Sequence, residues 1–335
     1  MTDTLLTNGR IVTQNDRREI IEDGAVAITD DRITAVGTAK ELEATHDADR
    51  VIDAEGCAVV PGLVGPHIHV SDILLRGAFA EDLGLYEWLF DVRQPVLSAM
   101  TPADHELAAR LYCVEAIQSG MTAFVENDLS LDWHDLAPTR RKLAAYDEMG
   151  VRNIYGAGIR DQRAGEAFEQ LFETVTGDGD RDPYPLVVET AEAFDGVESL
   201  IESRHDPDGR QSVWPAPATL GTTTAEALRR AYDLAETHDV MTTTHVAQAE
   251  TEEEGALSSI EYLRNIGYLG DRALLGHCVQ TDDRDVRILA ETGTAVAHNF
   301  RANMLTATGF APAVEMLDRG VPVGAGTDNP ILNDT

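Results

Sequence analysis

The sequence predicts an α/β protein built as a (β/α)8 barrel of the TIM type, with a small β module in front of it. Residues 57–335 contain short apolar runs that alternate with helical stretches, which is the pattern of βα units around a parallel sheet. Residues 1–56 contain only short strand-like runs separated by turns. We therefore expect two domains, a β module at residues 1–56 and a barrel at residues 57–335.

The β module is predicted from turn residues that separate runs of strand-forming residues. Asn8-Gly9 lies between residues 5–7 and residues 10–13, and this dipeptide is a hairpin signal. Asp30-Asp31 separates residues 25–28 from residues 32–36, which indicates a second turn. Residues 51–53 add another short strand before Glu55-Gly56.

The barrel is predicted from the number of apolar runs in the second segment. Eight runs can be counted, which is the number of strands that closes a (β/α)8 barrel. They cover residues 58–60, 122–125, 152–155, 212–214, 241–244, 273–275, 294–297 and 321–324. The clearest helical stretches between them are residues 102–118, 138–148 and 224–237.

The composition excludes several classes of protein. Hydrophobic residues make up 43% of the chain, and no apolar run approaches the ~20 residues that span a bilayer, so we expect no membrane partner. The 26 basic and 59 acidic residues give a net charge of −33, which repels nucleic acid. The cysteine spacing and the polar first residues favour a cytoplasmic protein. Such an acidic composition indicates a protein from a halophilic cell, because high salt screens the repulsion among the acidic side chains.

Histidines and an aspartate follow the predicted strands, where a barrel places its reactive groups. His67 and His69 follow the first strand, His245 the fifth, His277 the sixth and Asp328 the eighth. His-x-His on an extended segment directs both rings to one side. Three histidines and one carboxylate suit a single divalent metal ion, zinc first, with iron or manganese as alternatives. Such a metal makes water nucleophilic near neutral pH, and Asp328 is the expected base.

These motifs resemble those of the amidohydrolase superfamily. Residues 61–69, Pro-Gly-Leu-Val-Gly-Pro-His-Ile-His, are similar to its opening metal motif. Residues 74–77 and 85–89 are similar to a narrower group, the aminohydrolases and chlorohydrolases of the triazine-hydrolase and S-adenosylhomocysteine/methylthioadenosine deaminase type. The segments around His245, His277, His298 and Asp328 follow in that group's order. The resemblance runs from about residue 5 to the end of the chain and implies a metal-dependent barrel flanked by a small β module.

The resemblance also implies roles for individual residues. The family's metal ligands match His67, His69, His245 and Asp328. His277 matches the histidine that helps to orient and polarise the attacking water and the substrate. Glu87 matches a residue that contacts the substrate sugar in nucleoside-deaminating members, and a solvated glutamate at a helix start is the alternative interpretation.

The sequence departs from the family pattern at the expected proton shuttle. The related deaminases carry glutamate three residues after the strand-five histidine, and Gln248 stands at this position. An amide can donate a hydrogen bond to a ring nitrogen, but it cannot deliver a proton as a carboxylic acid does. Glu250 is an alternative shuttle, although the glutamates that follow it favour a solvated helix start.

Other departures concern the substrate pocket and the end of the chain. Related deaminases carry a substrate-contacting histidine after the fourth strand, and we expect Ala216 at this position. Arg160 and Arg163 are expected at the surface, with an anionic substrate group as their alternative partner. The family continues beyond the point that Thr335 occupies here, so we expect an incomplete composite β-sandwich, a truncated product and a homodimer that covers exposed edges.

The sequence therefore predicts a metal-dependent hydrolase of a non-peptide C–N bond. The expected reaction is deamination of an amino-substituted heterocycle of purine nucleoside, pterin or triazine type by metal-activated water. In it Asp328 takes the proton of the water, His277 stabilises the developing tetrahedral centre, and Gln248 holds the ring. A chlorohydrolase or N-dealkylating hydrolase of the same group is the first alternative, because a good leaving group requires less protonation than Gln248 can supply. A barrel that binds metal without turnover is the second alternative.

Overall fold

The chain folds into two compact units, and each is described here by itself. A computed structural model describes residues 2–78, 83–177, 182, 186–249 and 257–330. Unit 1 comprises Met1–Leu63 and unit 2 comprises Val64–Thr335. Residues 57–63 therefore belong with the first unit, although the sequence places the boundary at residue 56.

Unit 1 is a mixed β-sheet with the strand order β3-β2-β1-β4, and β5 also pairs with β1. β1 (Thr2–Val12), β2 (Ile20–Thr29) and β3 (Arg32–Thr38) are antiparallel neighbours, whereas β4 (Ala48–Asp53) and β5 (Ala58–Val59) run parallel to β1. Helix α1 (Ala39–Thr45) begins at a capping box in which Thr38 and Glu41 bond reciprocally. Its buried side chains complete a small core with β1 and β2, made of Leu5, Ala25, Ala27, Ala39 and Leu42.

Two predicted features of this region are wrong. The expected Asn8-Gly9 hairpin is absent, because β1 continues through both residues with a shift in register on either side of Gly9. Asn8 has φ +61, a conformation that asparagine tolerates better than most residues, so the pair forms an irregularity within the strand. The run at residues 58–60 is not the first barrel strand, since Ala58 and Val59 pair with β1.

Unit 2 contains two four-stranded sheets that join into a barrel. One has the order β6 (Leu63–Ile68), β7 (Met121–Asp128), β8 (Arg152–Ile159) and β9 (Gln211–Pro217). The other has the order β10 (Thr242–Val246), β11 (Ala273–His277), β12 (Ala295–His298) and β13 (Val323–Ala325). Single parallel bridges, Ile68 with Asp328 and Thr219 with His245, join the sheets at both edges. Within the described residues the strands therefore follow one another in the order of a closed eight-stranded barrel, as predicted.

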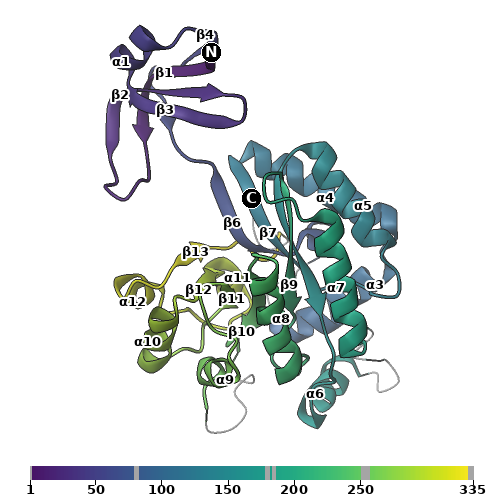
Figure 1. Cartoon of the computed structure of the whole chain (residues 1–335). Coiled ribbons are helices and arrows are strands. Elements are labelled where there is room, and N and C mark those ends of the chain that lie inside the picture. The colour runs from purple at the N-terminus through teal and green to yellow at the C-terminus, as the bar shows by residue number, and fades with distance from the viewer. Residues whose placement is uncertain (1, 79–82, 178–181, 183–185, 250–256, 331–335) are drawn as a thin grey trace. The chain divides into compact units, whose positions relative to one another are not determined.

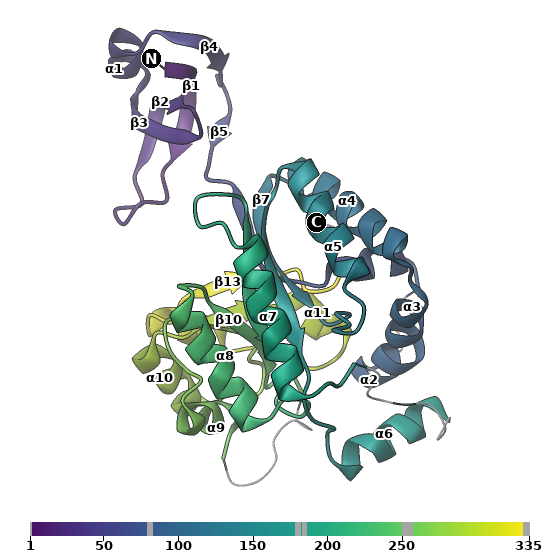
Figure 2. The same cartoon turned by 45° about the vertical axis from the view of Figure 1, so that its right-hand side comes forward.

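Helices connect the barrel strands and cover their outer side (Figures 1 and 2). After β6 come η1 (Val70–Leu75), α2 (Leu85–Glu87), the π-helical η2 (Trp88–Arg93), α3 (Gln94–Ala99) and α4 (Pro102–Gln118). The later connections contain α5 (Ala137–Met149), α6 (Glu166–Thr176), α7 (Thr190–Arg204), α8 (Ala225–Thr237), α9 (Ser259–Ile266), α10 (Asp283–Thr292), α11 (Phe300–Leu305) and α12 (Ala313–Asp318). Among the described helices, none is both long and apolar enough to cross a membrane.

Candidate metal centre and active site

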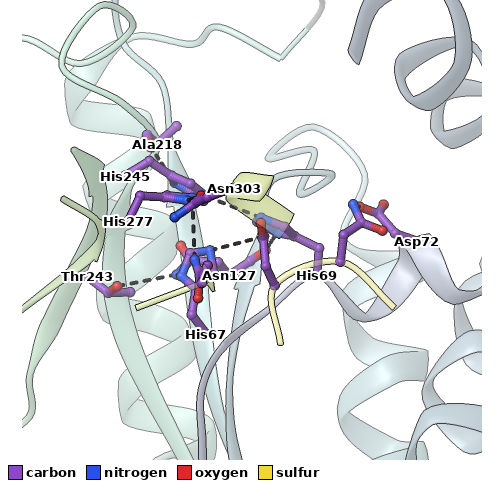
Figure 3. Close-up of polar contacts among 12 residues, drawn as sticks. His67, His69, Asp72, Asn127, Ala218, Thr243, His245, His277 and Asn303 are labelled. Carbon is purple, nitrogen blue, oxygen red and sulfur yellow. Dashed lines mark hydrogen bonds and ion pairs between the residues drawn. The ribbon is translucent and has the colours of Figure 1, made fainter. Parts of the chain in front are cut away.

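Three predicted metal ligands, His67, His69 and His245, meet at one end of the barrel strands (Figure 3), and the fourth, Asp328, lies beside them. The Nε2 atoms of His69 and His245 are 3.2 Å apart. Oδ1 of Asp328 lies 3.3 Å from Nε2 of His69 and 3.6 Å from Nε2 of His67. All four side chains are buried, with exposed fractions between 0% for His67 and 7% for His69. The cluster is therefore shielded from bulk water, and its donor atoms point at one another.

All four residues lie at the seams where the two sheets of the barrel join. The backbone N–H of Asp328 donates to the carbonyl of His67, and the N–H of His69 donates to the carbonyl of Asp328, both at 2.9 Å. At the other seam, the N–H of His245 donates to the carbonyl of Ala218 at 3.3 Å. Closing the barrel therefore also brings together predicted ligands that are far apart in the sequence.

Hydrogen bonds at the outer ring nitrogens orient the histidines. Nδ1 of His69 lies 2.7 Å from the backbone oxygen of Asn127, and Nδ1 of His245 lies 2.8 Å from that of Ala218. A carbonyl only accepts, so both Nδ1 atoms carry the proton and both Nε2 atoms keep a free lone pair. The side-chain amide of Asn127 lies 3.1 Å from Nδ1 of His67 and bridges it to Thr243. Partners of this kind fix the ring orientation of metal-binding histidines.

The chemistry of the cluster fits a divalent metal ion. Nε2 of His67 is buried and has no hydrogen-bond partner in the described part of the chain. Burial lowers the pKa of His67 to about 4 and holds the pKa of His245 well below its usual value, so both rings are neutral donors near pH 7. Burial alone would raise the pKa of Asp328, but the nearby rings of His67 and His69 hold it well below its usual value. Neutral imidazoles with one carboxylate are a donor set for zinc, iron or manganese.

His277 lies beside this cluster, with Asp328 and His67 close to its ring. Its Nδ1 lies 2.8 Å from Oδ1 of Asn303, an amide oxygen that accepts the ring proton. Burial lowers the pKa of His277, so the ring is neutral and Nε2 presents a lone pair. The predicted water-orienting histidine is therefore next to the predicted base and is held in one tautomer.

The backbone is strained at several of these strand ends. His277 has φ +73, Asp328 has φ +59, and Ala247 and Cys278 have φ +51 and +50. Each such conformation costs a residue with a side chain about 1–3 kcal/mol and persists only where the surrounding structure imposes it. Their clustering beside the donor atoms is typical of a functional site.

A cavity of about 1290 Å³ lies one residue away from the cluster: among the described residues its wall includes Ala218, which contacts His245, but none of the four predicted ligands. Ala218, whose carbonyl orients His245, and Gln248 are in its wall, so the predicted ring-holding residue faces the cavity. Glu87 is exposed and does not belong to the described cavity wall, although Leu85 and Tyr86 beside it do. Its role as a sugar contact stays a prediction. Glu250, the alternative proton shuttle, lies outside the described residues.

The structure corrects the expectations for the residues that face the substrate pocket. Ala216 lies within β9, is completely buried and is not in the cavity wall, whereas Ala218 is. The structure therefore does not place Ala216 at the pocket, and the match of this position to the family histidine stays a prediction. Arg160 is not a surface residue, because it lines the cavity, and burial together with Arg93 lowers its pKa to about 10. Arg163 also lines the cavity, but it is half exposed and pairs with Glu169.

Sequence reasoning missed residues that support the ligands. Asn127 contributes both its carbonyl and its amide to the histidines, and Asn303 fixes the tautomer of His277. Asn127 lies near the end of β7, where the same search for polar residues at strand ends could have found it. Asn303 lies in α11 and has no such signal.

A barrel that gathers three histidines and an aspartate in a buried cluster, beside a large cavity at the strand ends, defines a metal-dependent hydrolase of the barrel class. The amidohydrolase family matches residues 58–335, and the imidazolonepropionase-like composite domain of bacteria matches residues 24–48. The chain therefore belongs to the amidohydrolase family.

The similar proteins include deaminases and a chlorohydrolase. The chain is 35% identical to the 5-methylthioadenosine/S-adenosylhomocysteine deaminase of Nitratidesulfovibrio vulgaris (strain DP4) over 341 aligned residues, which cover 99% of this chain and 70% of the relative. A zinc-bound adenosine deaminase from Xanthomonas campestris superposes with a TM-score of 0.84 at 25% identity, covering 99% of this chain and 70% of the other. The zinc-bound atrazine chlorohydrolase of Arthrobacter aurescens, at 23% identity and a TM-score of 0.85, shares the fold and covers 99% and 73%.

Proposed function

We propose that the chain is a metal-dependent aminohydrolase that removes the exocyclic amino group of an adenosine-type purine nucleoside. The observation that carries this proposal is the convergence of His67, His69, His245 and Asp328 beside a cavity large enough for a nucleoside. The names of the deaminase relatives, at 35% identity over nearly the whole chain, support the purine as the heterocycle.

The cluster would hold one divalent metal ion, with zinc first among the candidates because the adenosine deaminase of similar fold binds zinc. When bound, such an ion polarises a water molecule and makes it nucleophilic near neutral pH. The low pKa of Asp328 keeps its carboxylate ionised and ready to accept a proton from that water. The lone pair at Nε2 of His277 accepts a hydrogen bond from the water and orients it toward the ring carbon.

Gln248 determines where the leaving group obtains its proton. Its amide donates a hydrogen bond to a ring nitrogen and leaves that nitrogen unprotonated. The proton that Asp328 takes from the water therefore passes to the exocyclic amine. The carbon–oxygen bond forms, the carbon–nitrogen bond breaks and ammonia departs, so one water is consumed for each ammonia released.

Arg160 favours a substrate that carries an anionic group. Its guanidinium faces the cavity and has no hydrogen-bond or ion-pair partner among the residues that the structure describes. Removing a cation from water without a partner is costly, and a carboxylate on the substrate offsets that cost. The deaminase relative is named for two substrates, methylthioadenosine and S-adenosylhomocysteine. Of these, S-adenosylhomocysteine carries such a carboxylate and methylthioadenosine does not. We therefore place S-adenosylhomocysteine first among the substrates.

The test is ammonia release in molar KCl with added zinc, from S-adenosylhomocysteine, methylthioadenosine, adenosine, guanine, a pterin and an aminotriazine. His67→Ala is the inactive variant, and His134→Ala changes an exposed histidine as the matched control. Release from the adenosine derivatives that disappears only in His67→Ala supports the proposal. Arg160→Gln should then raise KM for S-adenosylhomocysteine about tenfold or more and leave KM for methylthioadenosine nearly unchanged.

The chlorohydrolase alternative is tested in the same assay. The fold likeness to atrazine chlorohydrolase and the amide at Gln248 are the observations that favour it. Chloride release from a chlorotriazine, without ammonia release from the nucleosides, would replace the deaminase proposal. If neither ammonia nor chloride is released from any substrate while one metal ion is bound per chain, the result would favour a barrel that binds metal without turnover.

A further inference from the structure

Asp72 joins two segments of the barrel that lie on either side of it in the structure. It lies in η1, three residues after His69, and its side chain is completely buried (Figure 3). One oxygen, Oδ2, accepts a hydrogen bond from Nε of Arg93 and another from Nδ2 of Asn329, both at 2.7 Å. The other oxygen, Oδ1, has no partner in the described part of the chain. The two contacts therefore share a single carboxylate oxygen.

The first contact leads to the wall of the cavity. Arg93 is the last residue of η2, and Leu89, Phe90 and Arg93 of this helix all line the cavity. A π-helical turn is rare and occurs mostly at functional sites. The side chain of Arg93 is only 10% exposed, so its ion pair with Asp72 is largely desolvated and geometrically restricted. A substrate that packs against η2 therefore contacts the helix that carries Arg93, the ion-pair partner of Asp72.

The second contact leads to the base. Asn329 directly follows Asp328 and is 2% exposed. The backbone of Asp328 already bonds to His67 and His69, and its φ of +59 is unfavourable for a residue with a side chain. A bond from the next side chain to Asp72 is a further restraint on the rotation of this strained segment. Asp72 therefore restrains the direction of the Asp328 carboxylate without touching it.

We propose that Asp72 is a positioning residue that couples the cavity wall at Arg93 to the carboxylate of Asp328. When substrate packs against η2, Arg93 restrains the carboxylate of Asp72 through their ion pair. Asp72 in turn restrains Asn329, and with it the neighbouring Asp328. The catalytic meaning of this coupling rests on the proposed function, since it assumes that Asp328 is the base. The coupling itself rests only on the two hydrogen bonds to Oδ2.

The test uses two readouts, one of which does not depend on turnover. Cobalt(II), added to the metal-free protein, reports the geometry of the donor set through its visible absorption spectrum. Asp72→Asn and Asn329→Ala should both change the spectrum and lower kcat by ~10-fold or more, because small displacements of a reacting group are costly. Asp285→Asn is the matched control, since Asp285 is 2% exposed and pairs with the N-cap residue Asp282 in the capping box of α10. It should lower the melting temperature without changing the spectrum.

The Arg93→Gln variant distinguishes coupling through Asp72 from a purely structural role of Asp72. In the wild-type background this variant should raise KM and also change the cobalt spectrum, because it releases Asp72. In the Asp72→Asn background it should add little to either readout, since the link is already broken. Equal effects of Arg93→Gln in both backgrounds would overturn the proposal, as would an unchanged spectrum in Asp72→Asn. If the wild type shows no turnover, the proposed function fails, and the cobalt spectra still decide the coupling.

Discussion

Gln248 is the residue at which the proposed chemistry is most open to direct test. It lines the cavity, three residues after His245, and its amide can hold a ring nitrogen but cannot protonate it. Gln248→Glu should raise kcat for deamination by about tenfold or more, because a positioned general acid contributes factors of this size and larger. The gain should disappear above the pKa of the new carboxyl, which a pH profile of kcat would show.

Gln248→Met is the matched variant, since it keeps the length of the side chain and removes the hydrogen bond. It should raise KM. An unchanged KM in Gln248→Met together with an unchanged kcat in Gln248→Glu would show that position 248 does not contact the ring.

Buried histidines make the metal-free protein sensitive to acid. The pKa values of His67 and His105 are both lowered to about 4, mainly by burial, from a usual value of 6.5. Between these values the unfolded chain binds more protons than the folded one, so stability falls as the pH falls from 6.5 toward 4. Burial raises the pKa of Glu126 to about 6, which opposes this trend over a narrower range.

The histidines outweigh Glu126 because burial also lowers the pKa values of His245 and His277, so several groups shift in the same direction. We expect the metal-free protein to lose about 2 kcal/mol of unfolding free energy between pH 7 and pH 5, a loss that urea unfolding at the two values would measure. Added zinc should steepen the pH dependence, since protons compete with the metal for the same nitrogens. A midpoint that rises on acidification would contradict this prediction.

At the scale of elements, a buried ion cluster holds β7 against α5. Lys142 of α5 contacts the carboxylate of Glu126 and lies 3.0 Å from Oδ2 of Asp128, and all three side chains are buried. The hydroxyls of Tyr146 and Tyr155 donate to the same two carboxylates, at 2.7 and 2.6 Å. Asn127, which orients His67 and His69, lies between the two acids, so this cluster fixes the strand end that carries it.

Lys142→Met should lower the free energy of unfolding by about 3–5 kcal/mol, because it leaves two carboxylates buried without their cation. The sequence offers a natural control, since Lys40 is the other of its two lysines and is exposed on α1. Lys40→Met should leave the urea midpoint nearly unchanged. If Lys142→Met costs as little as Lys40→Met, the cluster does not stabilise β7.

The sequence predicted best those elements whose boundaries are set by neighbouring residues in the chain. The stretch at residues 102–118 matches α4, because Thr101 caps the helix and Pro102 begins it. The convergence of His67, His69, His245 and Asp328 was predictable because strand ends in a barrel share one face. Asp72 and Arg93 were not, since their contact joins residues 21 positions apart that follow no spacing rule. β5, with two residues, is too short to show a period.

At the scale of the whole molecule, the barrel could be predicted although only seven of the eight predicted runs lie in barrel strands, whereas the division between units could not. The strand of residues 58–59 depends on pairing with β1, a contact that no local pattern encodes. The homodimer and the halophilic habitat also stay predictions. The second of these depends on the net charge alone, and it has a consequence for stability that the purified protein can test.

The net charge of −33 should make the stability of the protein depend strongly on salt. Repulsion among exposed carboxylates acts over a Debye length of about 10 Å at 0.1 M salt, and this length shrinks to about 3 Å at 1 M. Raising KCl from 0.1 M to 2 M should therefore raise the melting temperature by about 5 °C or more. Glu55, Glu202 and Glu236 are exposed, and changing all three to Gln should reduce this rise and raise the melting temperature at 0.1 M. Equal salt slopes for this variant and the wild type would show that the dependence comes from general salting-out and not from charge repulsion.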